Sequence, residues 1–264
     1  MSKRTDFAQR ICAVLVLTLA PLITIASPQS AGSTDASFRF EVATIKPASP
    51  DARGNSINNR PGIFEVRNGS VRSLVQYGYS IHPAQVIGGP DWINSDRFDI
   101  TAKLEQQESE TDPNRVSTRD KRGRSAVRAL LVERFQLRLR QESRELPVYS
   151  LIVDKGGHKL TPSATGAGRV FTSSSNAIRT MNSEGFSSKG IAENFSFLDR
   201  PVLDETGLSG LFDFKLTWSD SLDADATAPS IFTAVREQLG LKLEAKKGQV
   251  GIYVIEKVEK PSGN

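Results

Sequence analysis

Cysteine and histidine are scarce in this chain. Among its 264 residues Cys12 is the only cysteine, and His82 and His158 are the only histidines. A single cysteine cannot form an internal disulfide, and structural zinc sites draw mainly on Cys and His ligands. We therefore expect no disulfide and no metal site, so the fold must be stabilised by burying apolar side chains. The length suffices for one large core or two small ones.

Long apolar runs are also scarce, and the only one lies near the start of the chain. It covers the 16 residues from Ile11 to Ala26, follows several basic residues and ends in small residues suited to cleavage. A membrane-spanning helix needs about 20 residues, and Pro21 weakens a helix here. We predict a signal peptide at residues 1–26 and a disordered lead-in at residues 27–37; a retained membrane anchor is the alternative. The mature protein would be exported, periplasmic or secreted, with no membrane span.

Charge of one sign is not in large excess. The 34 Lys and Arg residues and the 30 Asp and Glu residues give a formal net charge of +4. The basic residues are scattered, without the interleaved aromatic residues typical of a nucleic-acid surface, so no nucleic-acid partner is expected. The motifs HExxH, GxSxG, SxxK, GxGxxG and Walker A are all missing. We therefore assign no catalytic residue and no cofactor.

The chain does contain an internal repeat. Residues 127–149 align without a gap on residues 231–253, at an offset of 104 positions. The identical pairs are Glu133/Glu237, Leu137/Leu241, Leu139/Leu243 and Tyr149/Tyr253. Repeated sequence indicates a repeated structural unit, so we expect two related lobes.

Hydrophobic periodicity divides both lobes into helices and strands. Strands are predicted at 38–45, 63–66, 97–104, 137–139, 147–153, 211–214, 241–243 and 252–258, and helices at 71–79, 126–135 and 231–239. A further short helix, capped by Ser187 or Ser188, is predicted from Ile191, Phe195 and Leu198. The connections between the last elements of each lobe are too short for parallel crossovers, which favours antiparallel strands. The predicted fold class is therefore α+β, with two related lobes from an internal duplication and about two helices packed on a mainly antiparallel sheet in each.

The predicted lobe boundaries follow composition. The first lobe is expected at residues 38–160 and the second at residues 186–260. Residues 161–185 are rich in Ser, Thr, Gly and Asn, which is typical of a connection, so we interpret them as an inter-lobe segment with one strand near residues 169–172.

A loop of unusual composition follows the first predicted helix. Residues 88–92, Gly-Gly-Pro-Asp-Trp, combine free backbone angles, a fixed turn and a large aromatic face. We predict a ligand-binding site formed by Tyr79, His82, Asp91 and Trp92. The alternative is that Trp92 folds back as a lid on the first core and that His82 is simply an exposed loop residue.

Two groups of carboxylates are candidates for reactive sites. Asp99 and Asp213 occupy matched strand positions and could perform acid–base chemistry if they faced one cleft. The favoured alternative is that each accepts hydrogen bonds as a turn or cap residue within its own lobe. The acidic loop with Asp220, Asp223 and Asp225 lacks the central Gly and closing Glu of a calcium loop, so we expect a solvated loop.

Several motifs occur in a familiar order along most of the chain. They are FEVATIKP, GGPDWINSDRFDI, ALLVERFQLRL, ELPVYSLIVDKGGHKL and RPVLDETGLSGLFDF, followed by the closing helix and strand. In this order the chain resembles a family of soil-associated secreted proteins of unknown function that is expanded in Acidobacteria. A similar domain occurs at the C-terminal end of some BlaR-type membrane metallopeptidases. The resemblance implies a bacterial exported protein, and it transfers no protease activity because the peptidase motif lies outside the shared domain.

Three functions are compatible with these observations. The favoured one is an exported, non-enzymatic binding or sensory module for an unknown small molecule, peptide or protein. The alternatives are a secreted structural or interaction protein, and a carboxylate-dependent hydrolase of an unrecognised class. Fold and neighbouring domains alone cannot choose among them, so the choice depends on the geometry of a site.

Overall fold

A computed structural model describes residues 38–104, 115–166, 168–175, 177–221 and 228–261. The predicted signal peptide, the lead-in and two aspartates of the acidic loop, Asp223 and Asp225, lie outside the described residues. All described residues belong to one compact unit. No helix within the described ranges is long and apolar enough to cross a membrane.

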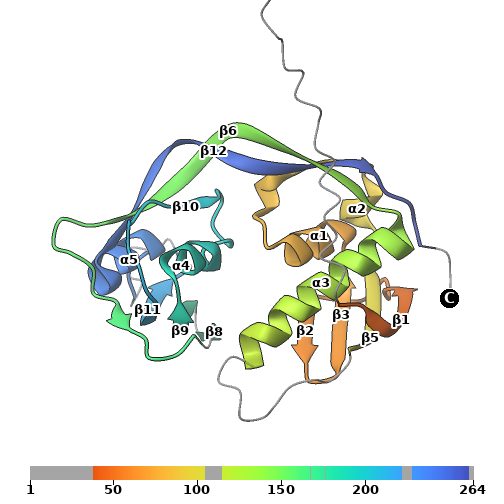
Figure 1. The fold of residues 1–264 in the computed structure, drawn as a ribbon, viewed down its shortest axis with the longest axis horizontal. Coiled ribbons are helices and arrows are strands. Elements are labelled where there is room, and N and C mark those ends of the chain that lie inside the picture. The colour runs from red at the N-terminus through yellow and green to blue at the C-terminus, as the bar shows by residue number, and fades with distance from the viewer. Residues whose placement is uncertain (1–37, 105–114, 167, 176, 222–227, 262–264) are drawn as a thin grey trace, which may run out of the picture. The chain divides into compact units, whose positions relative to one another are not determined.

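The described part of the chain is α+β, with five α-helices and three four-stranded, mainly antiparallel sheets (Figure 1). Its elements are β1 Phe40–Pro47, β2 Ser56–Arg60, β3 Ile63–Gly69, α1 Val71–Tyr79, the 3-10 helix η1 Pro83–Gln85, β4 Val86–Gly88, α2 Trp92–Ser95, β5 Phe98–Leu104, α3 Arg115–Phe135, β6 Arg138–Val153, β7 Thr161–Pro162, β8 Arg169–Ser175, β9 Ile178–Phe186, α4 Ser188–Asn194, β10 Val202–Asp204, β11 Phe212–Ser219, α5 Ile231–Leu239 and β12 Leu241–Lys257.

The first sheet has the strand order β1-β5-β3-β2, and all its pairs are antiparallel. Alternate residues of β5 are buried, as period-two patterning requires, and they pack with the inner faces of α1 and α3. The largest fully buried side chains of this first core include Phe64, Leu74, Ile93, Ile100, Leu131 and Phe135. Ser70 caps α1 by accepting a hydrogen bond from the backbone N–H of Ser73, which fixes the start of the helix as predicted.

The second sheet has the strand order β7-β11-β9-β8, again with antiparallel pairs. It packs with α4 and α5 around a second core that contains Leu216, Trp218 and Phe195. Residues 161–185, expected as a connection with one strand near residues 169–172, hold β7, β8 and most of β9. The inward residues of β9 include Ser183 and Gly185. Because neither has a large apolar side chain, the sequence of β9 lacks the alternation of apolar and polar residues that would predict a strand.

The third sheet, β10-β6-β12-β4, joins the two cores. Strands β6 and β12 form one long antiparallel ladder (Figure 1). The short strands β10 and β4 pair with it in parallel, one on each outer edge. Two short strands were predicted in place of each long one. The middle of the ladder is polar and exposed, so its apolar alternation is interrupted, while pairing between the strands continues.

The two halves of the chain present their elements in the same order. Each runs through three strands, a helix, a short strand, a further strand, a helix and a long strand; α2 and η1 are extra in the first half. The strand orders of the first two sheets also correspond position by position.

Candidate functional site

The structure places the four residues of the predicted site in separate surroundings. Tyr79, at the end of α1, has its ring 5.2 Å from that of Tyr253, and burial raises the pKa of its hydroxyl. Trp92 begins α2 and packs on the first core, with the ammonium group of Lys260 5.6 Å from its ring centre. Asp91 is exposed and makes no side-chain cap on α2. Tyr79 and Trp92 therefore contact the first core, each with its own cationic or aromatic neighbour.

The Gly-Gly-Pro sequence before Trp92 is explained by packing. Gly88 and Gly89 have φ angles of +77° and +81°, a region that favours glycine. A Cβ added to Gly89 would lie 2.7 Å from Cδ1 of Ile93, which is completely buried. The loop thus brings α2 close to the core, and these contacts account for its glycines without a ligand.

His82 is buried, which corrects the expectation of an exposed loop histidine. It is 6% exposed, and its Nδ1 accepts a hydrogen bond of 3.1 Å from the backbone N–H of Ala84. Its Nε2 lies 2.9 Å from the carbonyl oxygen of Leu198. These two contacts are those of the tautomer in which Nε2 donates to the carbonyl oxygen of Leu198 and Nδ1 accepts. His82 therefore links η1 to the segment that follows α4.

The matched carboxylates Asp99 and Asp213 hold backbone within their own sheets. Asp99 Oδ1 accepts from the backbone N–H of Asn68 at 2.8 Å, and Asp213 Oδ1 accepts from that of Gly185 at 2.7 Å. Asn68 and Gly185 have positive φ angles and lie just before the capped helices α1 and α4. Each carboxylate thus stabilises a bend at a helix entrance, as the favoured interpretation expected.

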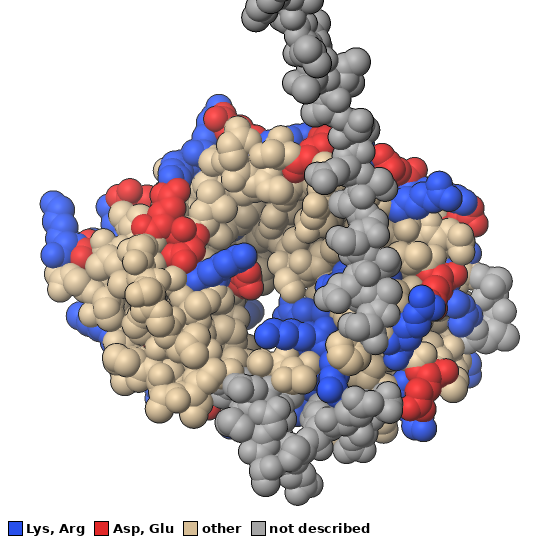
Figure 2. All heavy atoms as spheres, in the orientation of Figure 1, with Lys and Arg blue, Asp and Glu red and all other residues tan. Residues whose placement is uncertain are grey.

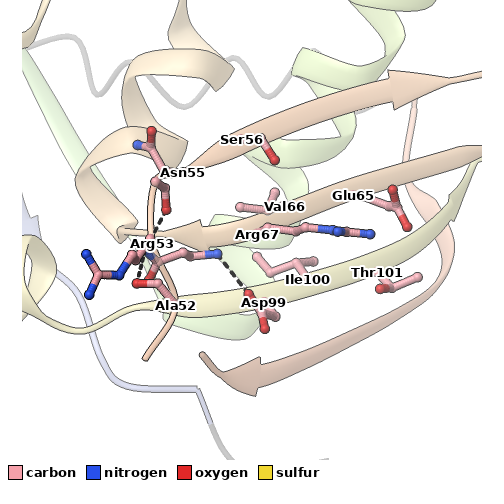
Figure 3. A pocket seen from close by; sticks show the side chains of 12 residues that line it. Ala52, Arg53, Asn55, Ser56, Glu65, Val66, Arg67, Asp99, Ile100 and Thr101 are labelled. Carbon is pink, nitrogen blue, oxygen red and sulfur yellow. Dashed lines mark hydrogen bonds between the residues drawn. The ribbon is translucent and has the colours of Figure 1, made fainter. Parts of the chain in front are cut away.

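A cavity of about 570 Å³ lies on the outer face of the first sheet, beside Asp99. Figure 3 shows Arg67 extended along the strands and the guanidinium of Arg53 directed away from Asp99. Arg53, Asn55 and Arg67 are exposed, so this face is open to water and its polar groups do not converge. It offers little enclosure to a ligand.

A deeper candidate lies between α1, η1 and α3 on one side and α4, β9 and β10 on the other. Two cavities of about 790 Å³ and about 480 Å³ adjoin there and share four lining residues. Those residues are Ser80, Ile81, Glu193 and Ser196. We call the two cavities together the cleft; Figure 2 shows the surface hollowed in this region, with Lys and Arg side chains along the edge formed by α3. His82 lines the smaller cavity and is the predicted site residue that belongs to the cleft.

The α3 wall of the larger cavity carries a compensated charge pair. Asp120 Oδ2 lies 2.6 Å from Nε of Arg124, and its Oδ1 accepts a hydrogen bond of 3.3 Å from the hydroxyl of Tyr77. The Arg124 guanidinium lies 5.3 Å from the centre of the Tyr77 ring. Burial, and then the charge of Asp120, raise the pKa of Tyr77 well above its ordinary value. Tyr77 therefore remains a neutral hydroxyl, and Asp120 balances Arg124.

A glycine in α3 makes this arrangement possible. A Cβ on Gly123 would lie 2.2 Å from Nδ2 of Asn59, which donates to the carbonyl oxygen of Arg119 at 2.9 Å. The same Cβ would lie 3.1 Å from the hydroxyl of Tyr77. Gly123 thus lets a strand residue and a tyrosine approach the helix axis beside the cleft.

The opposite wall is formed mainly by α4. Ser187 caps this helix by accepting from the backbone N–H of Gly190 at 3.2 Å. Glu193 is exposed in the cleft, and the buried Nδ2 of Asn194 has no hydrogen-bond partner. Gln76 of α1 and Asn194 therefore bring side-chain amides to both walls of the larger cavity.

Sequence reasoning missed most of this cleft. Asp120, Lys121 and Arg124 all precede the helix predicted at residues 126–135, in a charged and polar region without apolar periodicity. The i,i+4 spacing of Asp120 and Arg124 was the available signal for a paired helix face. Glu193 has no motif around it, and only the tertiary fold brings it opposite α3.

The cleft shows no arrangement typical of a metal centre. Within the described ranges, no three or more His, Cys, Asp or Glu side chains are grouped so that they could hold a metal ion. Comparisons with curated proteins and with solved structures found no match. A family of proteins of unknown function does match residues 72–258, which is most of the chain. The chain therefore belongs to the family described as protein of unknown function (DUF3738).

Proposed function

We propose that this protein is an exported, non-enzymatic binding module that holds a small ligand in the cleft. The observation that carries this proposal is the larger cavity of about 790 Å³, which is bounded by two different halves of the fold and lined by amides, hydroxyls and a tyrosine. Binding sites of this volume, enclosed between elements and lined by a few polar groups, are typical of small-ligand recognition. Export is supported by the signal-like sequence at residues 1–26.

The proposal includes an internal duplication. It is supported by the matching order of elements in the two halves and by the surroundings of the aligned tyrosines. Tyr149 of β6 lies beside Val202 of β10, and Tyr253 of β12 lies beside Val86 of β4, with parallel pairing in both cases. Each tyrosine ring also lies 5.2 Å from a second aromatic ring. Under this proposal the cleft lies between two copies of one ancestral unit, whose facing walls have diverged in sequence.

A thermal-shift screen of the mature protein, residues 27–264, tests the binding function. The ligand set would contain peptides, sugars, cell-wall fragments and nucleotides, because a ligand that binds the folded state raises the melting temperature. Ser196→Trp fills the cleft, and Ser173→Trp, on the exposed strand β8, is the matched control. We expect a ligand response in the parent and in Ser173→Trp that is lost in Ser196→Trp. A response that persists in Ser196→Trp would place the binding site elsewhere and refute the proposal.

A second function has one specific observation in its favour. Strand β8 is an edge of the second sheet, and its Val170 and Phe171 are 41% and 62% exposed. An open edge with exposed apolar residues can pair with a strand of another protein. This interaction function predicts that Phe171→Lys abolishes self-association or partner binding in sedimentation experiments, whereas ligand binding in the cleft would be unaffected.

A further inference from the structure

The larger cavity of the cleft carries one uncompensated charge on each wall. On the α3 wall Asp120 already balances Arg124, so the positive charge of Lys121 remains. On the α4 wall Glu193 contributes a negative charge. Neither Lys121 nor Glu193 makes an ion pair with another residue in the part of the chain that the structure describes.

The two charges belong to different elements that line the same cavity. Lys121 lies on α3, in the first half of the chain, and Glu193 lies on α4, in the second. Side chains of opposite charge that line one cavity without forming an ion pair can each pair with a ligand that carries both signs of charge. Charge-assisted hydrogen bonds are the stronger ones, so such a ligand would gain from each end separately.

The remaining lining indicates what lies between the two charges of the ligand. Gln76 and Asn194 supply side-chain amides, which match the donor and acceptor of a peptide group. Tyr77, Phe186 and Leu211 supply rings and an aliphatic side chain for apolar contact. The volume of about 790 Å³ lies in the range used for drug-sized ligands and exceeds the needs of a single amino acid.

We propose that the cleft binds short peptides with free termini, with the α-carboxylate at Lys121 and the α-ammonium at Glu193. This inference rests on the proposed binding function and specifies its ligand class. Lys189 lies one turn before Glu193 but lines the smaller cavity, outside the ligand path proposed here.

Isothermal titration of the mature protein with four forms of trialanine tests the proposal. The forms are the free peptide, the N-acetylated peptide, the C-terminal amide and the doubly capped peptide. We expect each cap to weaken binding by about tenfold or more, as the loss of one charge-assisted bond implies. Lys121→Gln should remove the preference for a free carboxylate alone, and Glu193→Gln should remove the preference for a free ammonium alone.

Two exposed residues outside the cleft provide matched controls. Lys155→Gln and Glu237→Gln make the same chemical changes at the surface and should leave all four affinities unchanged. Equal affinity of the parent for free and capped peptide would overturn the inference, as would terminal preferences that survive in both cleft variants. If no peptide binds while another ligand is blocked by Ser196→Trp, the peptide inference fails and the binding function stands. If peptide binds equally to Ser196→Trp, the cleft itself is refuted as the site.

Discussion

Gly240 connects the last helix to the last strand, and its replacement by alanine should be costly. It ends α5 with φ at +63°. A Cβ at this position would lie 2.2 Å from the carbonyl oxygen of Gly157 and 3.0 Å from Cα of His158. Both are backbone atoms, so no flexible side chain can move aside. The loop is also tied here, because the backbone N–H of Lys159 donates to the carbonyl oxygen of Leu239 at 2.7 Å.

The cost of Gly240→Ala has two parts. The left-handed conformation costs a residue with a Cβ about 1–2 kcal/mol, and the stiffer unfolded chain returns roughly 0.4–1 kcal/mol. Moving the backbone of the loop to admit the methyl group adds about 1–3 kcal/mol, by analogy with overpacked cores. We expect a loss of about 3 kcal/mol in the free energy of unfolding.

Gly207→Ala is the control that separates the two parts. Gly207 has φ at +67°, almost the same conformation, but no atom lies within 4 Å of a Cβ placed there. This variant should therefore lose only about 1 kcal/mol. Urea unfolding of both variants and the parent measures the difference, provided the slopes with urea agree. Equal losses for the two variants would refute the idea that the contact with the loop matters.

Three further predictions follow from single contacts. His82→Asn retains a side-chain acceptor for the cap of η1 but cannot reach the carbonyl oxygen of Leu198, so urea unfolding should show a loss of about 1–3 kcal/mol; unchanged stability would refute the link. Ser187→Ala removes the cap of α4 and should cost about 1 kcal/mol in the same assay, a loss that Ser187→Asn should largely avoid. Lys246, with Nζ 2.6 Å from Oε2 of Glu205, lowers the pKa of that carboxyl. Because the pKa of Glu205 is lower in the folded state than in the unfolded state, the ion pair stabilises the folded state at neutral pH, and this stabilisation is lost as the pH falls through the folded pKa. Glu205→Gln should therefore flatten the acid side of a profile of stability against pH. An unchanged slope would contradict this expectation.

Local signals predicted two of the helices, α1 and α5, at the residues where the structure has them. Ser230, the apolar spacing from Ile231 and the glycine at position 240 placed α5 at the residues where the structure has it. The same kind of signal, Ser70 followed by spaced apolar residues, placed α1. Both helices bury one face and have a capping residue at each end, so the information that fixes them lies within about ten neighbouring positions.

The strands of the second sheet could not be predicted in the same way. In β9 the inward positions include Ser183 and Gly185, and β8 is exposed along almost its whole length. Such strands are held by pairing, β8 with β9 and β9 with β11, rather than by their own apolar faces. Strand propensity depends strongly on this context, which is why a Ser- and Thr-rich segment was interpreted as a connection.

The cleft was not predicted from the sequence, for a related reason. Trp92 and its glycines stand out in the sequence, but a large aromatic side chain is as useful for closing a core as for contacting a ligand. The walls of the cleft instead carry charged residues such as Lys121 and Glu193, each of which resembles any other charged residue on a helix. Their significance depends on the distance between two helices that are separated in sequence, and no local pattern records that distance.

The register of the long ladder indicates why the two halves form one unit. Glu145 pairs with Gln249, and these residues are themselves 104 positions apart, the offset of the sequence repeat. If the halves are duplicates, the repeat maps Glu145 onto Gln249, the residue with which Glu145 pairs. The two copies are then related by a local two-fold axis that passes through this pair. Away from this pair, each strand packs into the core of the other half. Ile255 of β12 is buried in the first core, and Leu151 of β6 is buried in the second. Since each core is completed by a strand from the other half, the walls of the cleft are held by shared strands rather than by a flexible linker.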